Sequence, residues 1–149
     1  MRWKPHVTVA AVVEDSGRFL MVEEEVEGRI VYNQPAGHLE QGESLVDAVV
    51  RETREETGWH IRPTAVVGIH QWTSPGDRTF LRVSFAGRAL EHDPSRVPDA
   101  GIRAVLWLTR MEILRRGAAL RSPMVMKCLD DYLAGKHYPL DLLVRLDAA

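Results

Sequence analysis

The amino-acid sequence predicts an α/β (α+β) sandwich in which a mixed β-sheet carries a few packed helices. Short runs rich in β-branched residues alternate with turn signals along much of the chain. Two segments change instead to the helical spacing of apolar residues, one from Ser44 and one from Ser122. The chain has 149 residues, with 45% hydrophobic and 27% charged residues. This balance is typical of a globular protein, and we expect one domain over residues 1–149.

The predicted strands begin close to the N-terminus and are separated by turns at Glu14–Gly17, Glu27–Gly28 and Ser74–Asp77. Proline and glycine in Asn33–Gly37 interrupt the pattern, so a shaped loop is expected there. The expected strands cover residues 6–13, 18–23, 29–32, 61–72, 79–90 and 104–108.

The first predicted helix runs from Ser44 to a glycine stop at Gly58, with Leu45, Ala48, Val49 and Thr53 on one apolar face. Thr109–Glu112 has the form of a capping box that begins a second helix. The last helix is expected to start at Ser122–Pro123, with proline as its first helical residue, and to end before Gly135. The only cysteine, Cys128, lies in its apolar pattern, which favours a buried and inert thiol.

Charge and hydropathy argue against two classes of protein. The net charge of −2 and the pI near 6.3 disfavour a protein that binds nucleic acid through its phosphates. No apolar stretch approaches 18 residues, and no leader pattern opens the sequence. We therefore expect a cytoplasmic protein with no membrane partner; the sequence leaves a monomer and a homodimer open.

The segment from Gly37 to Trp59 contains the strongest indication of chemistry. Glu52, Glu55 and Glu56 follow i, i+3, i+4 spacing, so the three carboxylates share one helix face. Like charges this close repel, and a hard divalent cation with a preference for oxygen ligands offsets the repulsion. A solvated face with internal ion pairs is the ordinary alternative for such a helix. The preceding glycine-containing loop favours a charged ligand, because it brings backbone groups close to the site.

This segment resembles the Nudix box, G-x5-E-x7-R-E-U-x-E-E-x-G-U, where U is a bulky apolar residue. Thr53, at the first U position, is the one departure, and its methyl group can still pack in the core. All the remaining fixed positions are matched. Matching residues are Gly37, Glu43, Arg51, Glu52, Glu55, Glu56, Gly58 and, at the second U, Trp59.

The resemblance implies an α/β/α sandwich whose box forms a loop–helix–loop, and hydrolysis of a nucleoside diphosphate linked to another group. It also implies that Mg²⁺ is held by Glu52, Glu55, Glu56 and the Gly37 carbonyl, with Mn²⁺ as an open alternative. Glu43 and Arg51 would orient the acids. Either Glu52 or Glu56 would accept the proton of the attacking water, because the catalytic base varies across the family.

Segments outside the box resemble one bacterial phosphatase subgroup of this family over nearly the whole chain. Members of that subgroup act on nucleoside di- and triphosphates and on hydroxymethylpyrimidine pyrophosphate, a thiamine precursor, and release orthophosphate. The segments are KPHVTVAAVV, NQPAGHLE, His70–Trp72, Leu120–Pro123 and Tyr138–Leu140.

Residues for a small phosphorylated substrate are predicted from side-chain chemistry. Arg29 and Arg82 are the preferred phosphate contacts, because an arginine fork suits phosphate and their strands should flank the box helix. His70 and Trp72 fall on one face of their strand and offer rings for stacking, and Gln34 could bond a ring edge. Three alternatives remain: another nucleoside diphosphate substrate such as ADP-ribose or a dinucleoside polyphosphate, a nucleotide sensor without turnover, and action on RNA ends.

Overall fold

The computed structural model describes residues 1–147, so the last two residues of the predicted domain lie outside the described part. Within it, the strands form a network in the order β3-β2-β1-β6-β5, with β4 paired to β1 and β7 paired to β2. β1 and β6 are parallel, whereas the other pairings are antiparallel, which makes the sheet mixed. The strands are β1 (His6–Asp15), β2 (Arg18–Val26), β3 (Arg29–Asn33), β4 (Ala36–His38), β5 (Trp59–Thr73), β6 (Thr79–His92) and β7 (Ile102–Thr109).

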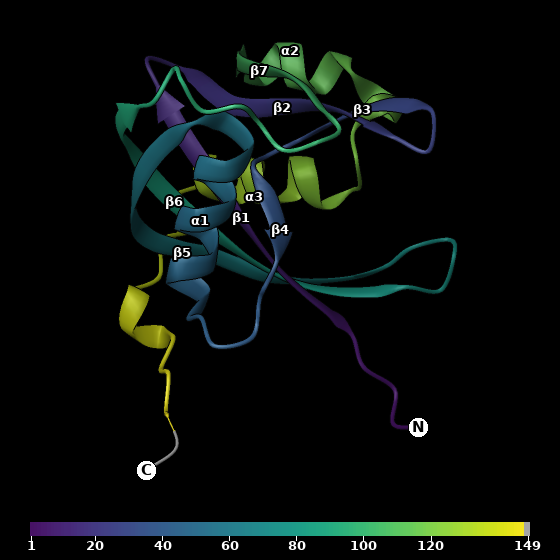
Figure 1. Ribbon diagram of the computed structural model, residues 1–149, viewed down its shortest axis with the longest axis vertical. Helices are drawn as coiled ribbons and strands as arrows, with labels where there is room; N and C mark the ends of the chain where they lie inside the picture. The colour runs from purple at the N-terminus through teal and green to yellow at the C-terminus, as the bar shows by residue number, and fades with distance from the viewer. Residues whose placement is uncertain (148–149) are drawn as a thin grey trace.

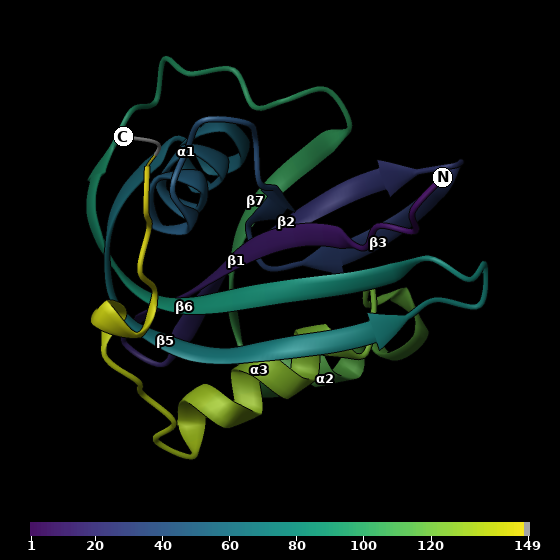
Figure 2. The ribbon, with the colours of Figure 1, turned by 90° about the horizontal axis from the view of Figure 1, so that it is seen from below.

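Helices cover both faces of the strands. In Figures 1 and 2, α1 lies on one side, and α2 and α3 lie on the other. The helices are α1 (Leu45–Thr57), α2 (Arg110–Arg115) and α3 (Met124–Leu133), with short 3₁₀ turns at Gly117–Ala119 and Leu140–Leu142. The predicted sandwich is therefore confirmed, and within residues 1–147 its layers bury two large cores and one smaller cluster of Ala65, Val67 and Ala86.

β1 separates the two cores because successive side chains point to opposite faces of a strand. Val9, Ala11 and Val13 pack toward Ala48 and Val49 of α1. Val12, on the opposite face, belongs to the core shared with α2 and α3, which includes buried Cys128. A strand buried on both faces needs the continuous apolar run that the sequence has here.

The box helix is fixed at both ends by its own sequence. The Ser44 hydroxyl accepts a hydrogen bond from the Asp47 amide (3.0 Å), which satisfies a free donor of the first turn. Gly58 ends the helix with a φ of 77°, a conformation in which a side chain is disfavoured. Thr53 is fully buried, and its hydroxyl donates to the Val49 carbonyl (2.7 Å). The departure from the box pattern is thus accommodated in the core.

Two local predictions differ from the structure. The expected loop Asn33–Gly37 runs into β4, a strand too short to show a periodicity of its own, which forms because β1 offers it a pairing edge. Pro123 lies at the N-cap of α3 and not at its first helical residue, although its backbone angles are already helical. The predicted turn at Ser74–Asp77 and the capping box at Thr109–Glu112 are confirmed. Among residues 1–147, no helix is both long enough and apolar enough to cross a bilayer.

Candidate active site

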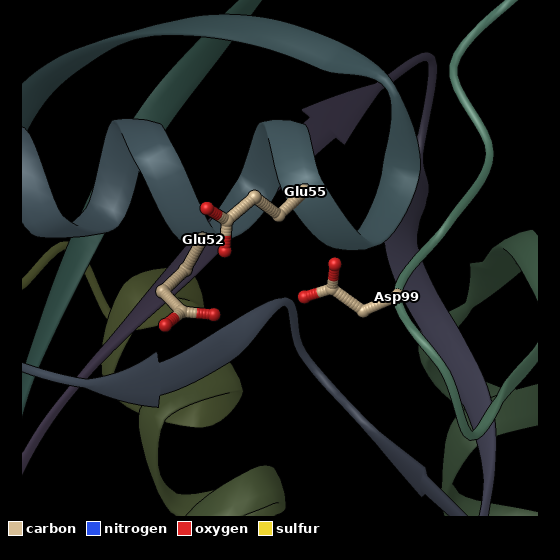
Figure 3. A group of neighbouring side chains, drawn as sticks. All are labelled: Glu52, Glu55 and Asp99. Carbon is tan, nitrogen blue, oxygen red and sulfur yellow. The ribbon is translucent and has the colours of Figure 1, made fainter.

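The carboxylates of α1 meet an acid from a distant loop. The Glu52 and Glu55 carboxylates lie close together beside the helix, and the Asp99 carboxylate points toward them from the segment between β6 and β7 (Figure 3). One carboxylate oxygen from each residue lies within 4.8 Å of the others. The Asp99 amide also donates to the Glu55 carbonyl (3.2 Å), which anchors the loop to the helix. The site therefore has an acidic member that the box helix does not supply.

Arg51 is shared among several of these acids. Its guanidinium donates to Glu43 (2.7 and 2.9 Å), Glu52 (2.9 Å) and Glu55 (3.1 Å). The hydrogen bonds from Arg51 hold the pKa of Glu43 below its usual range. Burial instead raises the pKa of Glu52, even though Arg51 opposes the change. Within residues 1–147, Arg51 is the only cation paired with Glu43, Glu52 or Glu55, and Asp99 has no ion pair, so negative charge is in excess.

Glu56 is more buried than Glu52 and does not belong to the cluster with Asp99. One carboxylate oxygen accepts a hydrogen bond from the Ala36 amide (2.9 Å), which links the helix to β4. Burial raises the pKa of Glu56 to about 8, and the negative charges of Glu24, Glu52 and Asp99 act in the same direction. In the absence of a cation, Glu56 therefore holds a proton at neutral pH.

Gly37 brings the backbone of β4 against Glu52. A Cβ atom at this position would overlap the Glu52 carboxyl group, so only glycine allows the close approach. The surrounding donors are carboxylate oxygens with excess negative charge, and the cluster contains neither histidine nor cysteine. Such a hard, oxygen-only donor set fits Mg²⁺ or Mn²⁺ and does not fit a softer metal.

A cavity of about 200 Å³ lies beside β4 and is lined in part by Gly37. One wall is aromatic: Trp72 and Phe80 are stacked with their centroids 5.8 Å apart, and His6 stacks on Phe80 at 5.1 Å. The polar lining includes the side chains of Glu24, Asn33, Arg82 and Arg121. The cavity thus combines a flat apolar surface with polar groups next to the acids.

The structure brings only part of the predicted substrate set into this cavity. Trp72 and Arg82 line it, and Arg82 is almost fully buried, with burial lowering its pKa. Gln34 is engaged at both ends, because its oxygen accepts from Arg82 (2.8 Å) and its nitrogen donates to the Val125 carbonyl (2.8 Å). Arg29 is exposed at the turn between β2 and β3 and does not line the cavity.

His70 and Trp72 do share one face of β5, as period-two alternation predicts. The His70 Nε2 atom nevertheless lies 3.0 Å from a carboxylate oxygen of Asp131 in α3, and the ring lines a different cavity. His70 and Trp72 therefore line different cavities, and of the two only Trp72 lines the cavity beside β4.

Comparison with known proteins places this geometry in a family. Residues 4–128 match the NUDIX domain. The chain belongs to the Nudix family. It is 43% identical over 141 residues to phosphatase NudJ of Escherichia coli strain K12, with 95% of this chain and 92% of the relative covered. Phosphatase NudJ of Shigella boydii matches with the same identity and coverage. A solved NUDIX hydrolase from Nitrosomonas europaea superposes with a TM-score of 0.95 at 47% identity, covering 98% of this chain and 100% of that one.

As a Nudix hydrolase, this chain has Glu52 and Glu55 of the box close together, and the third acid of their cluster, Asp99, lies outside the box. No periodicity marks the segment between β6 and β7. The available signal was its acidity: Asp93 and Asp99 flank Pro94 and Pro98 in a stretch without an apolar pattern. Only the folded chain shows which of these acids reaches Glu52 and Glu55.

Proposed function

We propose that this Nudix hydrolase is a phosphatase that requires a divalent cation, Mg²⁺ with Mn²⁺ as a substitute. Its substrates are nucleoside di- and triphosphates and thiamine-related pyrimidine pyrophosphates, from which it releases orthophosphate. The single observation that carries the proposal is the under-neutralised cluster of Glu52, Glu55 and Asp99 next to a cavity with an aromatic wall. The names of the NudJ relatives support phosphatase activity in particular.

The chain's own groups have separate tasks in this proposal. Glu52, Glu55, Glu56 and the Gly37 carbonyl would hold the cation, and Asp99, which is close to Glu52 and Glu55, would add a further carboxylate. When bound, the cation neutralises charge on phosphate oxygens and lowers the pKa of an attacking water. Arg51 keeps Glu52 and Glu55 oriented through its hydrogen bonds. Glu52 or Glu56 accepts the proton of the water, and the pH–rate profiles of E52Q and E56Q distinguish the two.

The cavity beside β4 accounts for the organic part of the substrate. The Trp72–Phe80 pair offers a flat face on which a base or pyrimidine ring stacks. Arg82 contributes a buried guanidinium, whose Nε atom has no hydrogen-bond partner among the described residues, for a phosphate oxygen. In this proposal, the phosphate chain lies toward Gly37 and the ring lies against the aromatic wall.

A substrate panel tests the proposal. The protein is incubated with Mg²⁺, and orthophosphate and pyrophosphate are assayed separately. The panel contains nucleoside di- and triphosphates, thiamine diphosphate, hydroxymethylpyrimidine diphosphate, ADP-ribose and dinucleoside polyphosphates. We expect orthophosphate from the nucleoside and thiamine-related diphosphates, and none after chelation of the metal.

Other outcomes are equally informative. Pyrophosphate from triphosphates, or cleavage of ADP-ribose, would replace the phosphatase by a Nudix pyrophosphohydrolase. Tight nucleotide binding without any product in Mg²⁺ would indicate a sensor.

A further inference from the structure

The cavity contains an acid that the hydrolytic machinery does not use. Glu24 lines it with a side chain that is 17% exposed, and its carboxylate lies 3.5 Å from the guanidinium of Arg121. Burial raises the pKa of Glu24, and Arg121 opposes the change. A carboxylate repels a phosphate chain, so Glu24 is placed to contact a different part of a phosphorylated ligand.

Asn33 adds a second acceptor to the same wall. It lies directly opposite Val22 in the pairing of β2 with β3, and Glu24 is two residues further along β2. Side chains two apart share a face, so Glu24 and Asn33 are diagonal neighbours on one face of the strand pair. The Asn33 Oδ1 atom is buried and has no hydrogen-bond partner among residues 1–147. A buried acceptor without a partner is costly, and a ligand donor would satisfy it.

We propose that Glu24 and Asn33 bind an exocyclic amino group of a ring stacked on Trp72 and Phe80. This inference rests on the function proposed above. The enzyme would then prefer diphosphates of amino-bearing rings, such as cytosine, adenine or a 4-aminopyrimidine, over their oxo counterparts. Arg121, next to Glu24, supplies a donor for the ring nitrogen adjacent to the amino group.

The physical basis of the preference is the reversal of hydrogen-bond polarity. An amino group donates to the two acceptors, whereas an oxo group in its place faces them with another acceptor. A hydrogen bond to a charged group is worth more than one between neutral groups, and an acceptor left unpaired adds its own penalty. Sites that bond a substrate donor reject analogues without it strongly. We expect a preference of roughly 10-fold or more in kcat/KM.

Cytidine diphosphate and uridine diphosphate provide the test, because at this ring position they differ in an amino and an oxo group. The wild-type enzyme should favour cytidine diphosphate by roughly 10-fold or more. E24Q should reduce the cytidine-to-uridine ratio of kcat/KM to about threefold or less. The variant should turn over the cytidine compound more slowly and the uridine compound faster, because the glutamine amide donates to an oxo group. Adenosine and inosine diphosphates provide a second pair with the same expected direction.

Glu25 provides the matched control. It is the next residue along β2, its side chain is 52% exposed, and its nearest cation is Arg103 at 3.8 Å. E25Q makes the same chemical change and should leave the cytidine-to-uridine ratio as it is in the wild type. Thermal melting of E24Q and E25Q shows that both variants are folded.

Two results would overturn the inference while leaving the proposed function intact. One is equal turnover of the cytidine and uridine diphosphates by the wild type. The other is an equal loss of both activities in E24Q, which would assign Glu24 to hydrolysis. If no nucleotide releases phosphate, the proposed function fails, and calorimetric binding of cytidine and uridine monophosphates then tests the inference separately. Equal affinities would refute it, and tighter binding of the cytidine compound that E24Q abolishes would support it.

Discussion

The acidic cluster on α1 has several carboxylates for one cation, whereas the cluster around Asp131 in α3 has two lysines for one carboxylate. On α1, the single guanidinium of Arg51 is divided among several carboxylates. On the other side of the strands, the Asp131 carboxylate is contacted by Lys127 (2.9 Å), Lys136 (3.4 Å) and His70 (3.0 Å). The α1 cluster is therefore short of positive charge, whereas the Asp131 carboxylate is fully paired.

The pKa values show what this difference means. Burial raises the pKa of Asp131, but hydrogen bonds from Lys127, His70 and Lys136 outweigh burial and lower it to about 2. Burial raises the pKa of Glu52, and that of Glu56 to about 8, without enough positive charge to reverse the change. Fully paired charges are typical of a structural cluster, whereas charges that the fold leaves unpaired are typical of a functional site. The following variants test that distinction.

The largest effect is expected for Glu52→Gln. A neutral amide is a poor ligand for a hard cation, so kcat/KM with Mg²⁺ should fall on the order of 100-fold or more. The fold should persist, because the substitution removes like-charge repulsion. Steady-state kinetics of E52Q are compared with those of D131N, which should stay within about twofold of the wild type. Equal losses in both variants would remove the functional distinction between the clusters.

Arg51→Ala should be strongly destabilising. It removes the only cation paired with Glu43, Glu52 and Glu55 among the described residues, and hydrogen bonds between charged groups are strong. The free energy of unfolding without metal should fall by about 2 kcal/mol. Urea unfolding with and without Mg²⁺ measures it, and Mg²⁺ should recover part of the loss. Exposed Arg54 on the same helix supplies the control R54A, which should change stability by less than about 0.5 kcal/mol.

Asp99→Asn tests the acid that comes from the loop. We expect the Mg²⁺ concentration for half-maximal activity to rise roughly 10-fold, with a smaller change in turnover at saturating metal. Metal titration of the activity measures both quantities. The comparable change in the same loop, D93N, should leave them unaltered, because Asp93 bonds Ser95 within its own turn. Indistinguishable titrations for D99N and the wild type would exclude Asp99 from the proposed metal site.

Asp131→Asn should have the smallest effect on activity, and its effect on stability should depend on pH. The folded pKa of about 2 lies below the ordinary value of 3.8, so the carboxylate stabilises the fold above pH 3.8. That contribution is lost as the pH falls toward 2. At pH 7 the variant should be less stable by about 2 kcal/mol, because each pKa unit of the shift is worth about 1.4 kcal/mol, and the difference should shrink below pH 4. Urea unfolding across this range measures it; a difference independent of pH would contradict the proposed cause.

The sequence was most informative where one element holds the whole pattern. The face of α1, both of its ends and the burial of Thr53 follow from local spacing and capping rules, and the structure agrees. Asp99 could not be predicted, because a loop without periodicity has no local signal for where it will pack. The three-residue strand β4 was not predicted for a related reason: it forms only through its pairing with β1.

Side-chain chemistry alone was a weaker guide to the cavity. Gln34 has the right groups for a ring edge, yet tertiary packing commits both of them to Arg82 and Val125. His70 has the predicted orientation, but α3 brings Asp131 to it. Neither contact could be inferred from residues close in sequence, since the partners of His70 and Gln34 lie on other elements. Trp72 and Arg82 remain the predicted residues that line the cavity.

The hydrogen bond between the Ala36 amide and Glu56 gives this enzyme a natural spectroscopic reporter. The amide proton sits on the only backbone donor that Glu56 contacts within residues 1–147, so its NMR frequency should follow the charge of that carboxyl group. Without metal, the signal should move as the pH passes about 8. With Mg²⁺ present, the same movement should occur at lower pH, because a cation favours the charged carboxylate. One backbone resonance would thus record metal occupancy without any substrate or added label.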